Sequence, residues 1–94
     1  LLKDKKEFEK SKEHFLKTIE IRPEFPVAHF NFALLLHAMK DHKTSQEHFL
    51  KAIDLDQNFA NAHYHFGLLL AELEDFEEAK NNLEKATDID QNHT

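Results

Sequence analysis

Histidine is the residue type whose number and placement in this sequence suggest chemistry. Eight histidines occur among 94 residues, and the imidazole side chain both titrates near neutral pH and binds divalent metals. The offset from His29 to His63 is the same as the offset from His14 to His48. Each pair would therefore occupy matching places if the chain repeats with that period.

A metal site is nevertheless not expected. His37 and His42 do not have the i,i+4 spacing that places two ligands on one face of a helix, and neither do His63 and His65. The chain contains no His-Glu-x-x-His motif. Nothing in the sequence fixes acidic ligands beside any of these imidazoles.

Two interpretations of the histidines remain. In the first, His29 and His63 replace aromatic side chains in the packing between helices, while His14 and His48 lie at the surface. In the alternative, some of these imidazoles make contacts whose strength changes as they gain protons near pH 6.

The residue types that support catalysis are scarce. The absence of cysteine excludes a thiol nucleophile, and a single glycine excludes a glycine-rich phosphate-binding loop. The adjacent acids Glu77 and Glu78 are explained by the favourable interaction of negative charge with the start of a helix. We therefore expect neither an enzyme nor a bound cofactor.

Charge is distributed unevenly along the chain. Residues 1–22 carry seven basic and five acidic groups (+2), residues 23–58 carry three and five (−2), and residues 59–94 carry two and eight (−6), which sums to −6. Because phosphate binding requires a concentrated basic surface, nucleic acid is not an expected partner. No apolar run approaches the roughly 20 residues needed to cross a bilayer and no signal segment opens the chain, so we expect no membrane insertion and a cytoplasmic location.

The elements that would position these residues recur along the chain with a fixed period. Shifting the sequence by 34 aligns identical residues at 24 of 60 positions. The segment 47–51 repeats the segment 13–17 without change, and Leu1-Leu2 aligns with Leu35-Leu36 and again with Leu69-Leu70. A fixed period of this length is typical of a solenoid built from stacked helical units.

Each period contains two helical patterns. Phe8, Ser11, Phe15, Thr18 and Ile19 are three or four residues apart, which places them on one stripe of an amphipathic helix. The sequence predicts an all-α fold of five helices near residues 8–21, 26–40, 43–56, 60–73 and 76–89. The helix near 26–40 has apolar residues on more than one side, so a second apolar face needs an explanation.

The pattern resembles the tetratricopeptide repeat (TPR), which has the same period. The family places a small residue in its first helix, here Ala33 and Gly67. It also places small residues where neighbouring helices cross, here Ser11, Thr18, Ser45, Ala52, Ala79 and Ala86. Leu36 and Leu70 stand where the family has tyrosine, which is a departure from the pattern. The resemblance implies a right-handed α-solenoid of antiparallel helix pairs.

The repeat register divides the chain into units. Residues 1–22 form a partial repeat, mainly its second helix, residues 23–56 and 57–90 form full repeats, and residues 91–94 begin another repeat or a tail. Leu1 aligns with Leu35 in the middle of a first helix, so we expect the chain to open inside such a helix. Neither end has the polar pattern of a capping repeat, so self-association through the ends is a further expectation.

In the family, the first helices of the repeats line a concave groove that binds a peptide or a partner helix. The resemblance therefore implies a protein-interaction scaffold with a protein or peptide partner. The corresponding residues here are Val27, Phe30, Asn31, Leu34, His37 and Ala38 in one repeat and Asn61, Tyr64, His65, Leu68, Ala71 and Glu72 in the next. Phe30, Leu34, Tyr64 and Leu68 would point away from the core, and the aromatic pair would anchor the ligand.

Two other interpretations of this surface follow from the same resemblance. The apolar residues could pack against a further turn of helices, in which case the chain is a structural or self-assembling part of a longer array. Some family members bind the carboxylate at the end of chaperone chains through a lysine and an asparagine on successive turns of the first helix. Phe30 and Leu34 occupy those positions here, so that carboxylate clamp is absent.

Overall fold

Five helices make up the part of the chain that the computed structural model describes, residues 2–93, with side-chain placement described over residues 5–90. They are α1 (Leu2–Ile21), α2 (Pro26–Ala38), α3 (His42–Leu55), α4 (Ala60–Glu72) and α5 (Phe76–His93). No strand occurs among these residues. The predicted all-α fold is confirmed.

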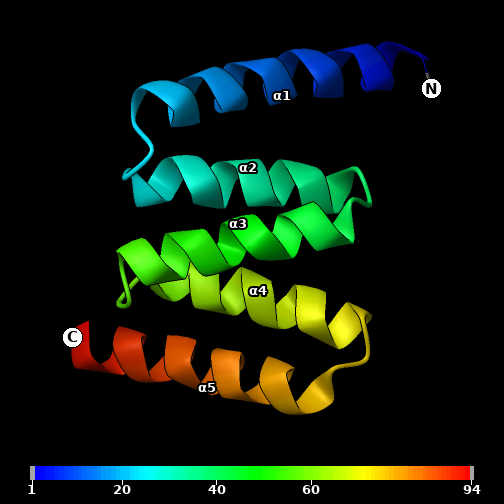
Figure 1. The fold of residues 1–94 in the computed structure, drawn as a ribbon. Helices are drawn as coiled ribbons and strands as arrows, with labels where there is room; N and C mark the ends of the chain where they lie inside the picture. The colour runs from blue at the N-terminus through cyan, green and yellow to red at the C-terminus, as the bar shows by residue number, and fades with distance from the viewer. Residues whose placement is uncertain (1, 94) are drawn as a thin grey trace.

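Successive helices run in opposite directions and stack along one axis (Figure 1). The stack measures 40 × 30 × 21 Å along its principal axes. Each helix packs mainly on its neighbours in sequence, and α2 also touches α4. This arrangement is the α-solenoid of antiparallel helix pairs that the repeat pattern predicts.

The turn inside each full repeat has the same conformation. Lys40 and Glu74, which occupy the same repeat position, have φ angles of 67° and 66°, in the left-handed region. The amide of Asp41 donates to the carbonyl of Leu36 over 2.9 Å, and the amide of Asp75 donates to Leu70 over 2.9 Å. These bonds satisfy carbonyl groups at the helix ends that would otherwise lack a partner.

Three helices, α2, α3 and α4, agree with their predicted ranges within two residues at both ends. The other two helices, α1 and α5, are longer than predicted. α5 continues to His93 rather than ending near residue 89. Residues 90–92 repeat residues 56–58, which form the turn between α3 and α4, but within residues 2–93 no further helix follows α5. α1 begins at Leu2 rather than at residue 8, so the segment 2–7 extends one helix instead of forming the end of a separate one. Lys6 aligns with Lys40 and Glu74, yet it lies inside α1. Residues 2–7 are strong helix formers, and within residues 2–93 no first helix packs beside α1 to require a turn there. The division into repeats at residues 22, 56 and 90 stays a prediction.

The core lies between the helices as a continuous row. Phe49, Ala52, Ala33, Ala62 and Leu69 have no exposed surface. Small residues let the two helices of each repeat cross closely. In the second repeat, where α4 crosses α5, only glycine fits, because a Cβ added to Gly67 would lie 2.8 Å from Cγ of Leu83. In the first repeat, the hydroxyl of Ser45 donates to the carbonyl of Ala33 over 2.7 Å across the same crossing.

Candidate functional site

The predicted groove residues lie on α2 and α4, the first helices of the two full repeats, but their exposure differs widely. Val27, Tyr64 and Leu68 are 41%, 47% and 39% exposed. Asn61 and Glu72 are also exposed, whereas Asn31, Leu34, His37 and His65 are partly buried. The exposed part of this set forms a surface that we call the α2/α4 face.

Phe30 does not belong to that face, and the expectation that its ring points away from the core is wrong. It is 9% exposed and is part of the buried core. Its ring centroid lies 6.2 Å from that of Phe49, 4.9 Å from Phe59 and 5.5 Å from His65. α4 and the turn before it cover Phe30, so it stabilises the junction between the repeats.

Tyr64 occupies the same repeat position as Phe30 but remains exposed. Within residues 2–93 no helix lies over α4 and α5 as α4 lies over α2 and α3. Leu34 and Leu68 show the same contrast, the first partly buried and the second 39% exposed. The apolar surplus of the first helices is thus core in one repeat and surface in the next.

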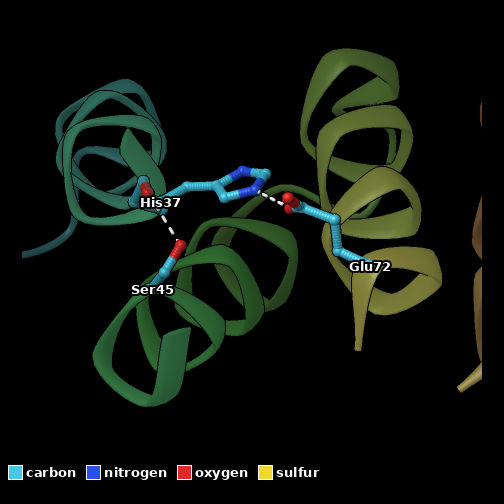
Figure 2. Close-up of polar contacts among 4 residues, drawn as sticks. His37, Ser45 and Glu72 are labelled. Carbon is cyan, nitrogen blue, oxygen red and sulfur yellow. Dashed lines mark hydrogen bonds and ion pairs between the residues drawn. The ribbon is translucent and has the colours of Figure 1, made fainter. Parts of the chain in front are cut away.

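His37 of α2 and Glu72 of α4 join the two helices across the outer edge of this face. The imidazole Nε2 donates to the Glu72 carboxylate, and Figure 2 shows the ring reaching from α2 across α3 to the carboxylate. This hydrogen bond, with the nearby charge of His37, holds the pKa of the Glu72 carboxyl below its usual range. The bond links successive first helices at a position that is partly exposed to solvent.

More imidazoles gather beside this bond. The ring centroid of His42 lies 5.9 Å from that of His37, and the Nδ1 atom of His42 is buried without a hydrogen-bond partner. Burial, and to a smaller degree the charge of His37, lowers the pKa of His65. Over the described residues, no three His, Asp or Glu side chains come together as metal ligands.

An open hollow lies between the end of α4 and the exposed side of α5, and it includes Ala71, one of the predicted groove residues. It has a volume of about 650 Å³, and its apolar lining includes Ala71, Phe76, Ala79 and Leu83. Phe76 is 64% exposed. The sequence analysis included Ala71 but missed the α5 part of this surface, although the alignment offered a signal: Leu83 matches Phe49, which is completely buried.

His29 and His48 form a hydrogen-bonded pair between α2 and α3. Their Nδ1 atoms are 3.1 Å apart and their rings stack with centroids 5.3 Å apart. The Nε2 atom of His29 lies 2.7 Å from the carbonyl oxygen of Pro23. The expectation that His48 lies at the surface is therefore wrong, whereas His29 is buried as a packing residue should be.

His63 is the second buried histidine, and it has different partners. Its Nε2 atom lies 3.1 Å from the carbonyl oxygen of Gln57, and its Nδ1 atom lies 3.1 Å from Oδ1 of Asn82. Asn82 stands where His48 stands in the first repeat. The two repeats thus share one buried histidine position but differ in the residue that faces it.

Comparison with known proteins agrees with this geometry. The sequence profile described as tetratricopeptide repeat matches residues 24–92. A structure of MamA from Desulfovibrio magneticus RS-1 superimposes with a TM-score of 0.86 at 19% identity, covering 97% of this chain and 51% of that one. This chain therefore spans about half the length of MamA.

Two further solved structures are similar. The first TPR of Spaghetti (RPAP3), bound to the HSP90 peptide SRMEEVD, has a TM-score of 0.87 and 20% identity over 95% of this chain and 71% of that one. YrrB, described as a TPR protein with an unusual peptide-binding site, has a TM-score of 0.79 and 33% identity over 83% of this chain and 40% of that one. No curated protein matches this chain in sequence. Within residues 2–93, no helix has the length and apolar content to cross a membrane.

Proposed function

Because this chain belongs to the tetratricopeptide-repeat family, we propose that it is a protein-interaction module that binds a peptide or a partner helix on the α2/α4 face. The observation that carries the proposal is the exposure of Tyr64 and Leu68 on this face, 47% and 39%. An exposed aromatic and aliphatic pair with polar neighbours is typical of a protein-binding surface. The peptide bound by the RPAP3 domain and the peptide-binding site described for YrrB support the same kind of function.

The charge of the α2/α4 face limits which kinds of ligand can bind there. α2 and α4 contain no lysine or arginine, and Glu72 is their single acidic residue. An anionic ligand would thus meet no fixed positive charge, and burying an unpaired carboxylate is costly. The partner that fits offers an apolar side chain to Tyr64 and Leu68, and its main-chain amides can bond to Asn31 and Asn61. A chain-terminal carboxylate does not fit, since Phe30 and Leu34 stand where a clamp would be.

The experiment selects binders from a phage-displayed library of random peptides and measures their affinity for variants. We expect the double substitution Tyr64→Ala, Leu68→Ala to weaken the selected peptides by at least about tenfold, the effect of losing about 1.4 kcal/mol from one buried anchor. Leu50→Ala is the matched control, because Leu50 is 51% exposed on α3, a second helix of its repeat, and does not belong to the α2/α4 face.

Affinity that survives in the double variant and falls in the Leu50 control would contradict the proposal.

Light scattering on the chain alone addresses the alternative of a self-assembling structural module. A mass that rises with concentration, and stops rising when Phe76 of the hollow is replaced by lysine, would favour that alternative instead.

A further inference from the structure

We propose that the two repeats respond differently to acid, because the equivalent histidines His29 and His63 face partners of opposite hydrogen-bonding character. His29 faces another imidazole, and His63 faces an amide oxygen. As a consequence, lowering the pH would destabilise the packing of the first repeat and leave the packing of the second repeat intact.

The hydrogen bonds of His29 fix where its proton lies. The carbonyl oxygen of Pro23 can only accept, so Nε2 of His29 must donate to it over 2.7 Å. In the neutral ring, Nδ1 of His29 is then an acceptor, and it takes its hydrogen bond from Nδ1–H of His48 over 3.1 Å. The pair is fully bonded when one proton lies between the two Nδ1 atoms.

The pair can accept only one additional proton without losing this contact. A first proton at the free Nε2 of His48 leaves its Nδ1–H donating to His29, but it places a positive charge on a ring whose burial disfavours that charge. A second proton, on Nδ1 of His29, sets two N–H groups against each other and places two positive rings at a centroid distance of 5.3 Å. The bond between α2 and α3 then breaks, together with the packing that depends on it.

The groups around His48 do not compensate for this repulsion. Burial and the charge of His29 lower its pKa, and Glu47 on its own helix opposes them more weakly. On the side of α2, the ring of Phe32 lies 4.7 Å from that of His48, and beyond it α1 presents Phe15 to Phe32. Because the pKa of His48 is lowered from 6.5, its contribution to stability is complete above pH 6.5 and is lost as the pH falls below that value.

The second repeat has the reverse arrangement. Nδ2 of Asn82 donates to the carbonyl of Glu78 over 2.9 Å, which turns Oδ1 of Asn82 toward His63. His63 thus has an acceptor at each ring nitrogen, Oδ1 of Asn82 and the carbonyl of Gln57. A neutral imidazole can donate to one of them, and an imidazolium donates to both. Asp54 and Lys85 are the charged residues of a hollow that His63 also lines.

The chain supplies its own reciprocal test, since His48 and Asn82 are equivalent positions. His48→Asn gives the first repeat the partner found in the second, and Asn82→His does the reverse. Amide hydrogen exchange, corrected for the intrinsic rate at each pH, reports the opening of α2 and of α4 separately. In the unmodified chain we expect protection of α2 to fall from pH 7.5 to pH 5.5, because the charged form of His48 is disfavoured in the folded state, while protection of α4 is retained.

In His48→Asn, the loss in α2 should disappear, and in Asn82→His a similar loss should arise in α4. His14→Asn is the matched control, because His14 holds the same repeat position on α1 but is exposed and should leave the pH response of α2 unchanged. If Asn disrupts α3 at pH 7.5, His48→Gln supplies the same acceptor on a longer side chain. A full loss of α2 protection in a folded variant without His48, or an equal loss in α4 of the unmodified chain, would overturn the proposal.

Discussion

At the scale of single residues, the environment of a side chain in this chain depends on the repeat that follows it. Phe30 and Tyr64 share a repeat position, yet three aromatic rings surround the first and solvent covers much of the second. Aromatic side chains bury a large apolar area, so the same type of residue stabilises the core in one place and offers binding energy in the other.

Replacing each of these two residues by alanine separates the roles. Phe30→Ala removes a buried ring, so we expect it to lower the free energy of unfolding by about 3–5 kcal/mol. Tyr64→Ala removes an exposed ring and should change it by less than about 0.5 kcal/mol. Urea unfolding followed by circular dichroism measures both values. Equal losses in the two variants would show that Tyr64 is covered in solution.

At the scale of elements, the same turn conformation joins the two helices of each full repeat, although neither turn contains the glycine that adopts this conformation most easily. Lys40 and Glu74 adopt the left-handed conformation, which is unfavourable for residues with a Cβ. The hydrogen bonds from Asp41 and Asp75 to the preceding helices hold these turns in place. The strain costs stability in each repeat and can be removed without touching the core.

Lys40→Gly and Glu74→Gly should each raise the free energy of unfolding by about 0.5–1 kcal/mol, because glycine adopts this conformation without a steric penalty. Lys51→Gly provides the contrast: Lys51 is exposed in the interior of α3, where glycine should cost about 1 kcal/mol. Thermal unfolding of the three variants gives the comparison. A loss of stability in both turn variants would mean that the aliphatic stems of Lys40 and Glu74 contribute more than the strain removes.

The helices were predictable from sequence because apolar spacing and the repeat period both mark them, and the interior boundaries agree within two residues. The start of α1 was not predictable, since alignment assigns Lys6 to a turn that forms only when a first helix packs beside it. The exposure of the predicted groove residues could not be read from the sequence either. Phe30 and Tyr64 carry the same signal, and only the position of α4 distinguishes them. Likewise, the spacing of His29 and His48 gives no sign that their rings meet.

At the scale of the whole molecule, the two full repeats depend on a narrow junction. Phe49 is completely buried and lies 5.9 Å from Phe66, ring centroid to ring centroid, across the boundary between α3 and α4. In a solenoid, each unit contacts only its neighbours, so cooperative unfolding depends on such interfaces. Loss of this contact should let the repeats unfold separately.

Phe66→Ala tests the coupling with a reporter that the chain already contains. Tyr64 is the single tyrosine and tryptophan is absent, so intrinsic fluorescence reports on the second repeat while circular dichroism reports on all helices. We expect a loss of about 3–5 kcal/mol and two urea transitions that no longer coincide. In Leu50→Ala, whose side chain is exposed, the two curves should superimpose. Superimposed curves in Phe66→Ala would show that other contacts couple the repeats.

Because a following repeat covers Phe30 and none covers Tyr64 within residues 2–93, adding a repeat would change which of these side chains is exposed. Inserting a copy of residues 57–90 after residue 90 would place a new α4 over Tyr64 and bury it, while the copy would carry its own exposed tyrosine one period further on. Ligand recognition would then move along the solenoid with its last turn, although no original residue had been changed. Repeat number is thus a means of choosing which copy of an identical side chain meets the ligand.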